Sequence, residues 1–209
     1  AGSLTPARAF RLLRRRPPLE VEARSRFTVR GDRLSETYSF ICRPLQGQLD
    51  ALTVHFSEPV GQLDWSLLAA GETTVFARRL EPVDRGSRDG PAMTPWPAAE
   101  SWRIELTPPV PVAGTLRATA GRPFTAAVPL PLAWVESAVA ATGEVLVQAV
   151  DREQPEIRNR RLTELPPRRR GGDLPLETVS ELAYDMRNVG RGDEPAAELV
   201  PPGATDRPA

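Results

Sequence analysis

The chain has 209 residues, and its 27 basic and 27 acidic side chains give a formal net charge of zero at pH 7. All 27 of those basic residues are arginine, because the sequence contains no lysine. A neutral chain has no overall field that attracts nucleic acid or an anionic membrane surface, and no apolar run approaches the roughly 20 residues of a membrane-spanning helix. We therefore expect neither a nucleic-acid partner nor a membrane span within this sequence.

The residues that are absent or rare exclude several kinds of site. A Walker-type phosphate loop, a protein-kinase site and a Schiff-base site each need a lysine. A zinc site built from thiolates and imidazoles takes three or four of them, whereas the chain has only Cys42 and His55. The sequence thus predicts no cofactor and no metal, and its single cysteine cannot form a disulfide within the chain.

Residues 1–18 are expected to be a linker or a short basic lead-in. The stretch 7–16 (ARAFRLLRRR) is rich in arginine and is followed by Pro17 and Pro18. A twin-arginine export signal would need an apolar region after the arginines, and the residues that follow are not apolar enough to be one.

Alternation with a period of two begins at Leu19. From Leu19 to Val29 the apolar or small side chains alternate with charged and polar ones, which is typical of a half-buried strand. Gly31 and Asp32 then supply a turn, and a second strand follows at 36–42. Further strands are predicted at 51–56, 73–80, 102–106, 115–120, 124–128, 144–150 and 182–186.

Short strands at this spacing, separated by turns rich in proline and glycine, are typical of an antiparallel sandwich or barrel. Only 132–141 has a helical composition, and it also fits a strand through Trp134. We therefore predict an all-β fold, an antiparallel β-sandwich with long Pro/Arg-rich loops at 82–97 and 151–177. The sandwich domain is assigned to 19–189. Residues 190–209 are assigned to a disordered tail or linker whose removal should not change the melting temperature, because few of them are apolar.

The order of the strand motifs resembles that of a group of bacterial modules. Leu-x-Val-x-Phe (52–56) is followed by Val-Gly-x-x-x-Trp (60–65), Trp-x-Ile-x-Leu (102–106), Gly-x-Leu-x-Ala (114–118), Pro-Leu-Pro-Leu (129–132) and Gly-Glu-Val-Leu-Val (143–147). Over 19–187 this order is similar to the β-sandwich modules repeated inside large, uncharacterised envelope-associated proteins of high-GC bacteria. The resemblance implies a passive module of a longer chain, and it brings no catalytic residues with it.

Two features are candidates for partner binding. Trp96 lies between two prolines in the predicted loop 82–97, where it either stacks on a sugar ring or folds down as a lid over one end of the sandwich. Arg168, Arg169 and Arg170 end a cluster of arginines that begins at position 158. Acidic residues are interleaved with this cluster, so it is either a solvated surface segment or a site that docks onto an acidic partner or another domain.

Tryptophan and histidine side chains elsewhere have structural explanations. Trp102 is in phase with Ile104 and Leu106, so we expect it in the core, and the neighbours of Trp65 and Trp134 are also apolar. His55 lies in a predicted strand without the nucleophile elbow that a hydrolase triad would need.

The charged motifs also have structural explanations. Arg30-Gly31-Asp32 fits a turn better than an adhesion tripeptide, and the second copy at 191–193 is expected by chance in a chain this rich in arginine, glycine and aspartate. Calcium takes six or more oxygen ligands, whereas the loop 84–90 has two acids and two arginines. Glu58, Asp64, Glu100 and Glu105 are expected on the wet faces of strands, although a glycosidase pair depends on a separation that only the fold can give.

We expect from these observations that the chain is not an enzyme. It is predicted to be a non-catalytic structural or interaction module of a larger extracytoplasmic or membrane-associated assembly, in the periplasm or cell envelope. Any membrane tether would then lie outside this chain, and the partners would be other domains or subunits. The alternative is a carbohydrate-binding module that uses Trp96 in an exposed loop.

Overall fold

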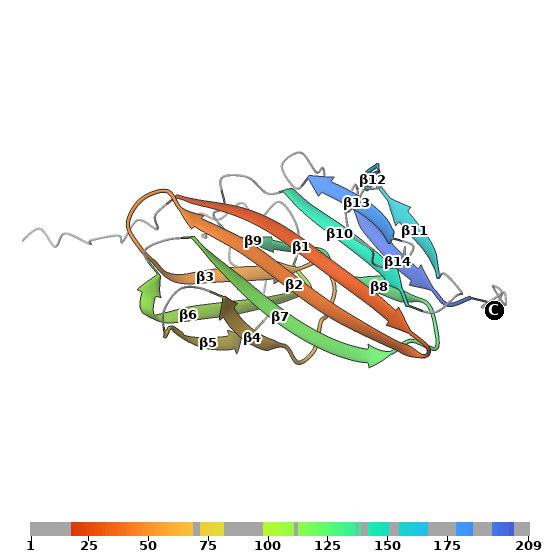
Figure 1. The fold of residues 1–209 in the computed structure, drawn as a ribbon, viewed down its shortest axis with the longest axis horizontal. Helices are drawn as coiled ribbons and strands as arrows, with labels where there is room; N and C mark the ends of the chain where they lie inside the picture. The colour runs from red at the N-terminus through yellow and green to blue at the C-terminus, as the bar shows by residue number, and fades with distance from the viewer. Residues whose placement is uncertain are drawn as a thin grey trace, which may run out of the picture.

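A computed structural model describes residues 18–68, 72–81, 98–110, 113–136, 138, 142–150, 155–166, 179–185 and 194–202. In these ranges fourteen strands form three sheets (Figure 1). The predicted all-β sandwich is therefore confirmed. Within the same ranges, no helix has the length and apolar character that crossing a membrane requires.

The largest sheet has seven strands, in the order β12-β13-β10-β1-β2-β7-β4. Its pairs are antiparallel except for β1 and β10, which run parallel. The strands are β1 (Leu19–Arg30), β2 (Arg33–Pro44), β4 (Asp64–Leu68), β7 (Gly114–Pro123), β10 (Thr142–Ala149), β12 (Thr163–Glu164) and β13 (Val179–Asp185).

Two smaller sheets complete the fold. A four-stranded sheet has the order β5-β6-β3-β9, and a three-stranded sheet has the order β11-β14-β8 at the end of the molecule that carries the C-terminus (Figure 1). The first contains β3 (Leu49–Phe56), β5 (Thr74–Arg79), β6 (Glu100–Val110) and β9 (Ala133–Val135). The second contains β8 (Val128–Leu130), β11 (Glu156–Arg160) and β14 (Ala196–Val200).

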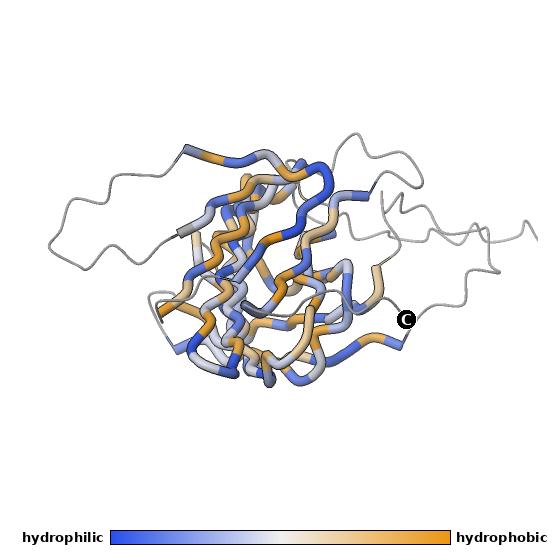
Figure 2. Tube along the Cα trace, turned by 90° about the vertical axis from the view of Figure 1, so that its right-hand side faces the viewer, coloured by the Kyte–Doolittle hydropathy of each residue, from blue (hydrophilic) through white to orange (hydrophobic). Residues whose placement is uncertain are grey.

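The core forms because the sequence alternation gives each long strand one apolar face. Along β1 every second side chain is buried, and Figure 2 shows apolar and polar residues alternating along the strands. Phe27, Tyr38 and Phe56 are fully buried, and their rings meet edge to face with centroids 5.9 and 5.0 Å apart. Such aromatic contacts add about 1 kcal/mol each beyond area burial. Phe56 belongs to the four-stranded sheet, so these rings join the two larger sheets.

Several local expectations are confirmed. Gly31 adopts a positive φ of 57° in the two-residue turn between β1 and β2, a conformation that glycine adopts without steric cost. Trp102 is 9% exposed and Trp134 is 4% exposed, and Trp65 packs half-buried against the core. Of the two alternatives for 132–141, the strand through Trp134 is confirmed as β9, and the described part of this segment forms no helix.

Another local expectation is wrong. Residues 124–127 are not a strand, and β8 starts only at Val128. The sequence analysis also missed β4, β11 and β12.

The tail assigned to 190–209 is wrong for residues 196–200. These residues form β14, which pairs with β11 on one side and β8 on the other. Ala197, Leu199 and Val200 are buried, Leu199 completely. Two flanking strands supply hydrogen bonds and an apolar surface, so a segment with only a few apolar residues still folds. Residues 203–209 lie outside the described part of the chain.

Removal of β14 should therefore destabilise the protein. A chain that ends at Pro195 should melt several degrees lower than one that ends at Pro202, because it lacks the central strand of the three-stranded sheet. Leu199→Ala in the full chain should lower the free energy of unfolding by about 2–5 kcal/mol, as truncation of a buried leucine does. Thermal and urea unfolding measure both effects. Equal melting temperatures for the two truncated chains would show that β14 contributes nothing to stability.

Candidate functional site

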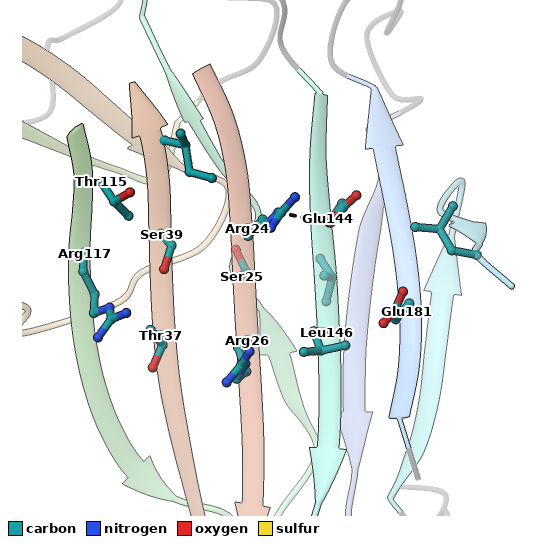
Figure 3. A pocket seen from close by; sticks show the side chains of 13 residues that line it. Arg24, Ser25, Arg26, Thr37, Ser39, Thr115, Arg117, Glu144, Leu146 and Glu181 are labelled. Carbon is teal, nitrogen blue, oxygen red and sulfur yellow. Dashed lines mark ion pairs between the residues drawn. The ribbon is translucent and has the colours of Figure 1, made fainter. Parts of the chain in front are cut away.

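A groove with a volume of about 360 Å³ lies on the outer face of the seven-stranded sheet. Figure 3 shows its side chains projecting from β7, β2, β1, β10 and β13. The same alternation that buries Phe27 and Tyr38 turns their strand neighbours, Arg26 and Thr37, outward into the groove. The site is therefore a direct consequence of the period-two pattern.

Strand register decides which groove residues are neighbours. Arg24 on β1 pairs with Ser39 on β2, which pairs with Arg117 on β7. On the other side, Arg24 pairs with Glu144 on β10. None of the described residues that line the groove is aromatic: they are Arg24, Ser25, Arg26, Thr37, Ser39, Ile41, Thr115, Arg117, Glu144, Val145, Leu146, Leu165 and Glu181.

The three groove arginines differ in their partners. Arg24 forms ion pairs with Glu144 (Nε–Oε2 3.3 Å; Figure 3) and with Glu22 (Nη2–Oε2 3.5 Å). Arg26 and Arg117 form no ion pair with any described residue. The side of the groove formed by β1, β2 and β7 therefore carries unpaired positive charge beside the hydroxyl groups of Thr37 and Ser39.

A second hollow of about 290 Å³ lies beside the three-stranded sheet. Its lining includes Arg158 and Arg160, two of the three described arginines of the predicted cluster, together with Glu58. Arg158 is already paired with Glu156 at 3.0 Å. Arg168, Arg169 and Arg170 lie outside the described residues, as do Trp96 and the loop 84–90.

Glu100 is not on a wet face as the sequence analysis expected. It is 3% exposed, and its Oε2 accepts hydrogen bonds from Arg79 Nη2 (2.9 Å) and from the backbone N–H groups of Val60 (3.1 Å) and Gly61 (3.4 Å). Its Oε1 accepts one from the indole N–H of Trp102 at 2.7 Å. Both oxygens are occupied, so this carboxylate fastens the segment after β3 to β6 and has no free oxygen for chemistry.

A second buried carboxylate, Glu36, is held in the same way. Tyr38 donates its hydroxyl hydrogen to Oε2 at 2.5 Å, and Arg122 forms an ion pair with Oε1 at 2.6 Å. Burial, followed by the charge of Glu36, raises the pKa of Tyr38 well above its ordinary value. Tyr38 therefore stays protonated and keeps donating this hydrogen bond, which a buried carboxylate needs.

His55 and Ser101 form the one hydroxyl–imidazole pair among the described hydrogen bonds, with Nδ1 and Oγ 2.8 Å apart. They face each other across the β3–β6 ladder, so their contact follows from the register. His55 is 8% exposed, stacks on Trp134 and lines neither groove. Its Nε2 has no hydrogen-bond partner, so no second group orients the ring as a catalytic base requires.

Cysteine and metal chemistry find little support in the described residues. Burial raises the pKa of the Cys42 thiol to about 12, so the nucleophilic thiolate is not formed at neutral pH. No group of three or more His, Cys, Asp or Glu side chains that could hold a metal ion occurs in the part of the chain that the structure describes.

The groove itself was missed by the sequence analysis. Arg24 and Arg26 were recognised as the polar face of a strand, but nothing in the sequence shows that β7 would lie next to β2 and bring Arg117 to the same face. The available signal was arginine and hydroxyl residues on the polar faces of several predicted strands, and it becomes a site only through the register.

Comparisons with known proteins assign this chain to no family. No protein-family model and no curated protein matches the chain. Yeast LTA4 hydrolase is similar over 87% of this chain and 28% of its own, with a TM-score of 0.42 and 10% identity. The M1 zinc metallopeptidase from Deinococcus radiodurans is similar over 88% of this chain and 42% of its own, with a TM-score of 0.34 and 13% identity. The chain thus spans less than half the length of either protein, and likeness at this level assigns it no activity.

The environment of His55 predicts a pH dependence of stability. Burial lowers the pKa of His55 below its ordinary value of 6.5, and the charge of Glu136 opposes this only in part. Below pH 6.5 the unfolded chain therefore binds a proton that the folded chain does not. The free energy of unfolding decreases as the pH is lowered, until the folded histidine also becomes protonated.

Urea unfolding at pH 8 and pH 5 tests this dependence. His55→Asn keeps a polar group beside Ser101 and removes the titration, so the variant should lose less stability than the wild type between the two pH values. Surface carboxylates titrate in both proteins, and the comparison subtracts them. An equal loss in both proteins would mean that His55 does not contribute to the pH dependence.

Proposed function

We propose that the chain is a non-catalytic structural and interaction module of a larger assembly, and that it binds its partner in the groove on the seven-stranded sheet. The observation that carries this proposal is the groove itself: about 360 Å³ on a solvent-facing sheet surface, with Arg26 and Arg117 unpaired within the described residues. This volume is within the range of about 300–1,000 Å³ that is usual for ligand sites.

The buried polar groups support binding over catalysis. Glu36 and Glu100, the two buried carboxylates of the described core, already hold Tyr38, Trp102 and two arginines. Catalytic acids need an oxygen that reaches the substrate, and neither of these has one to spare. The groove offers guanidinium and hydroxyl groups, which recognise a ligand without reacting with it.

The partners in this proposal are other domains or subunits of an extracytoplasmic or membrane-associated assembly. The strand order resembles that of modules repeated in envelope-associated proteins, and this resemblance supports the location. Glycan binding through Trp96 is the competing outcome, and the experiment below includes it.

The experiment fills the groove and asks whether binding is lost. Ser39→Trp places a bulky ring between Arg24 and Arg117, whereas Ser35→Trp places the same ring on the same face of β2 outside the groove. These two tryptophan variants are screened beside the wild type against glycans, peptides and neighbouring domains of the parent protein. The same screen includes Trp96→Ala and an Arg168/Arg169/Arg170→Ala variant. Circular dichroism and thermal melting confirm that each variant is folded.

We expect Ser39→Trp to abolish the binding seen with the wild type and Ser35→Trp to leave it unchanged within about twofold. The wild type should hydrolyse no glycoside, ester or peptide substrate. Glycan binding that only Trp96→Ala removes would favour the carbohydrate-binding alternative. Hydrolysis that survives repurification would defeat both binding proposals.

A further inference from the structure

Arg26 and Arg117, which form no ion pair with a described residue, determine which charge a ligand of the groove must carry. Register places Arg26 beside Thr37 and Arg117 beside Ser39, so the two arginines lie about 10 Å apart across the strands and about 7 Å apart along them. The hydroxyl groups of Thr37 and Ser39 lie between them (Figure 3). Guanidinium groups bind carboxylates through paired N–H donors, so the groove fits two carboxylates set some residues apart.

The groove also offers apolar contacts. Ile41, Leu146 and Leu165 line it together with the arginines. A small inorganic anion would leave these side chains unused, so the ligand has both carboxylates and apolar groups along its length.

Two other classes of polymer fit less well. Single-stranded nucleic acid and most sugars bind by stacking on aromatic rings, and none of the described lining residues is aromatic. Nucleic-acid binding also depends on many phosphate contacts, whereas two unpaired arginines supply few.

Dimensions favour an extended polypeptide. The groove crosses five strands, or four spacings of about 4.8 Å, which gives a width of about 19 Å. An extended chain advances about 3.3 Å per residue, so about six residues cross it. In such a segment side chains two residues apart lie about 7 Å apart on one face, so every second residue, whether acidic or apolar, would face the groove.

We infer that the groove binds an acidic, extended polypeptide segment of a partner, with its carboxylates on Arg26 and Arg117 and its apolar side chains against Ile41, Leu146 and Leu165. This inference rests on the proposed function, because it names the ligand of the same groove. Arg24 contributes less, since Glu22 and Glu144 already neutralise it.

The test uses the full chain and a fluorescein-labelled octapeptide in which glutamate and leucine take turns at every second position and serine fills the positions between them, so that both face the groove. Binding is followed by fluorescence anisotropy at low and at physiological ionic strength. A second octapeptide with glutamine in place of every glutamate tests whether the carboxylates matter. The double variant R26Q/R117Q removes the two groove charges, and R33Q/R78Q removes two exposed charges elsewhere, on β2 and β5.

The glutamate peptide should bind the wild type at least tenfold more tightly than the glutamine peptide, and added salt should weaken it, since the arginines are solvent-exposed. R26Q/R117Q should weaken binding of the glutamate peptide by about tenfold, whereas R33Q/R78Q should change it by less than twofold. Equal binding of both peptides, or equal losses in both double variants, would overturn the inference.

Failure of the inference can be separated from failure of the proposed function. A ligand that binds the wild type, is lost in Ser39→Trp and does not depend on Arg26 or Arg117 would leave the groove as a binding site and exclude an acidic ligand. If Ser39→Trp weakened the binding of none of the screened ligands, the groove would not be the binding site of this protein.

Discussion

The position of Tyr38 constrains both the core of this protein and its surface. Its ring is buried between Phe27 and Phe56 and so connects the two larger sheets, while its hydroxyl group is held by Glu36, and Glu36 by Arg122. Loss of the hydroxyl would leave a buried carboxylate short of a donor, which is costly. With Tyr38 fixed facing inward, strand alternation forces Thr37 and Ser39 outward on the same strand, so the core packing determines which residues form the groove.

Polar groups are divided between the interior and the outer face by their role. Inside, hydrogen-bond donors fill both oxygens of Glu100, and Glu36 is held by the hydroxyl group of Tyr38 and by an ion pair with Arg122. Outside, Arg26 and Arg117 have no ion pair with a described residue. A satisfied buried network stabilises one structure, whereas unpaired surface charge is available to a partner. This division is the physical reason for proposing binding on the outer face of the seven-stranded sheet.

The all-β class, the turn at Gly31 and the buried Trp102 could be predicted because each depends on local alternation or on one residue. The parallel pairing of β1 with β10, the burial of Glu100 and the strand at 196–200 could not, because each depends on segments far apart in the sequence. Ala197 and Leu199 illustrate the limit. Their segment looks too polar to fold alone, and it becomes a central strand only because β8 and β11 lie on either side of it. The groove could not be predicted for the same reason, since Arg117 joins Arg24 and Arg26 through register.

Part of the support for the groove lies beneath it, on the inner face of the seven-stranded sheet. Gly143 on β10 faces Tyr184 on β13, and a Cβ atom there would collide with the tyrosine ring. The ring can therefore lie across β10 so that its hydroxyl group donates to the carbonyl oxygen of Ala133 on β9 at 2.7 Å. This contact fastens β10 and β13, one side of the groove, to the four-stranded sheet. Because that support lies on the inner face, substitutions of outward-facing arginines change the charge of the groove while its walls stay in place, so their effects on binding report on recognition.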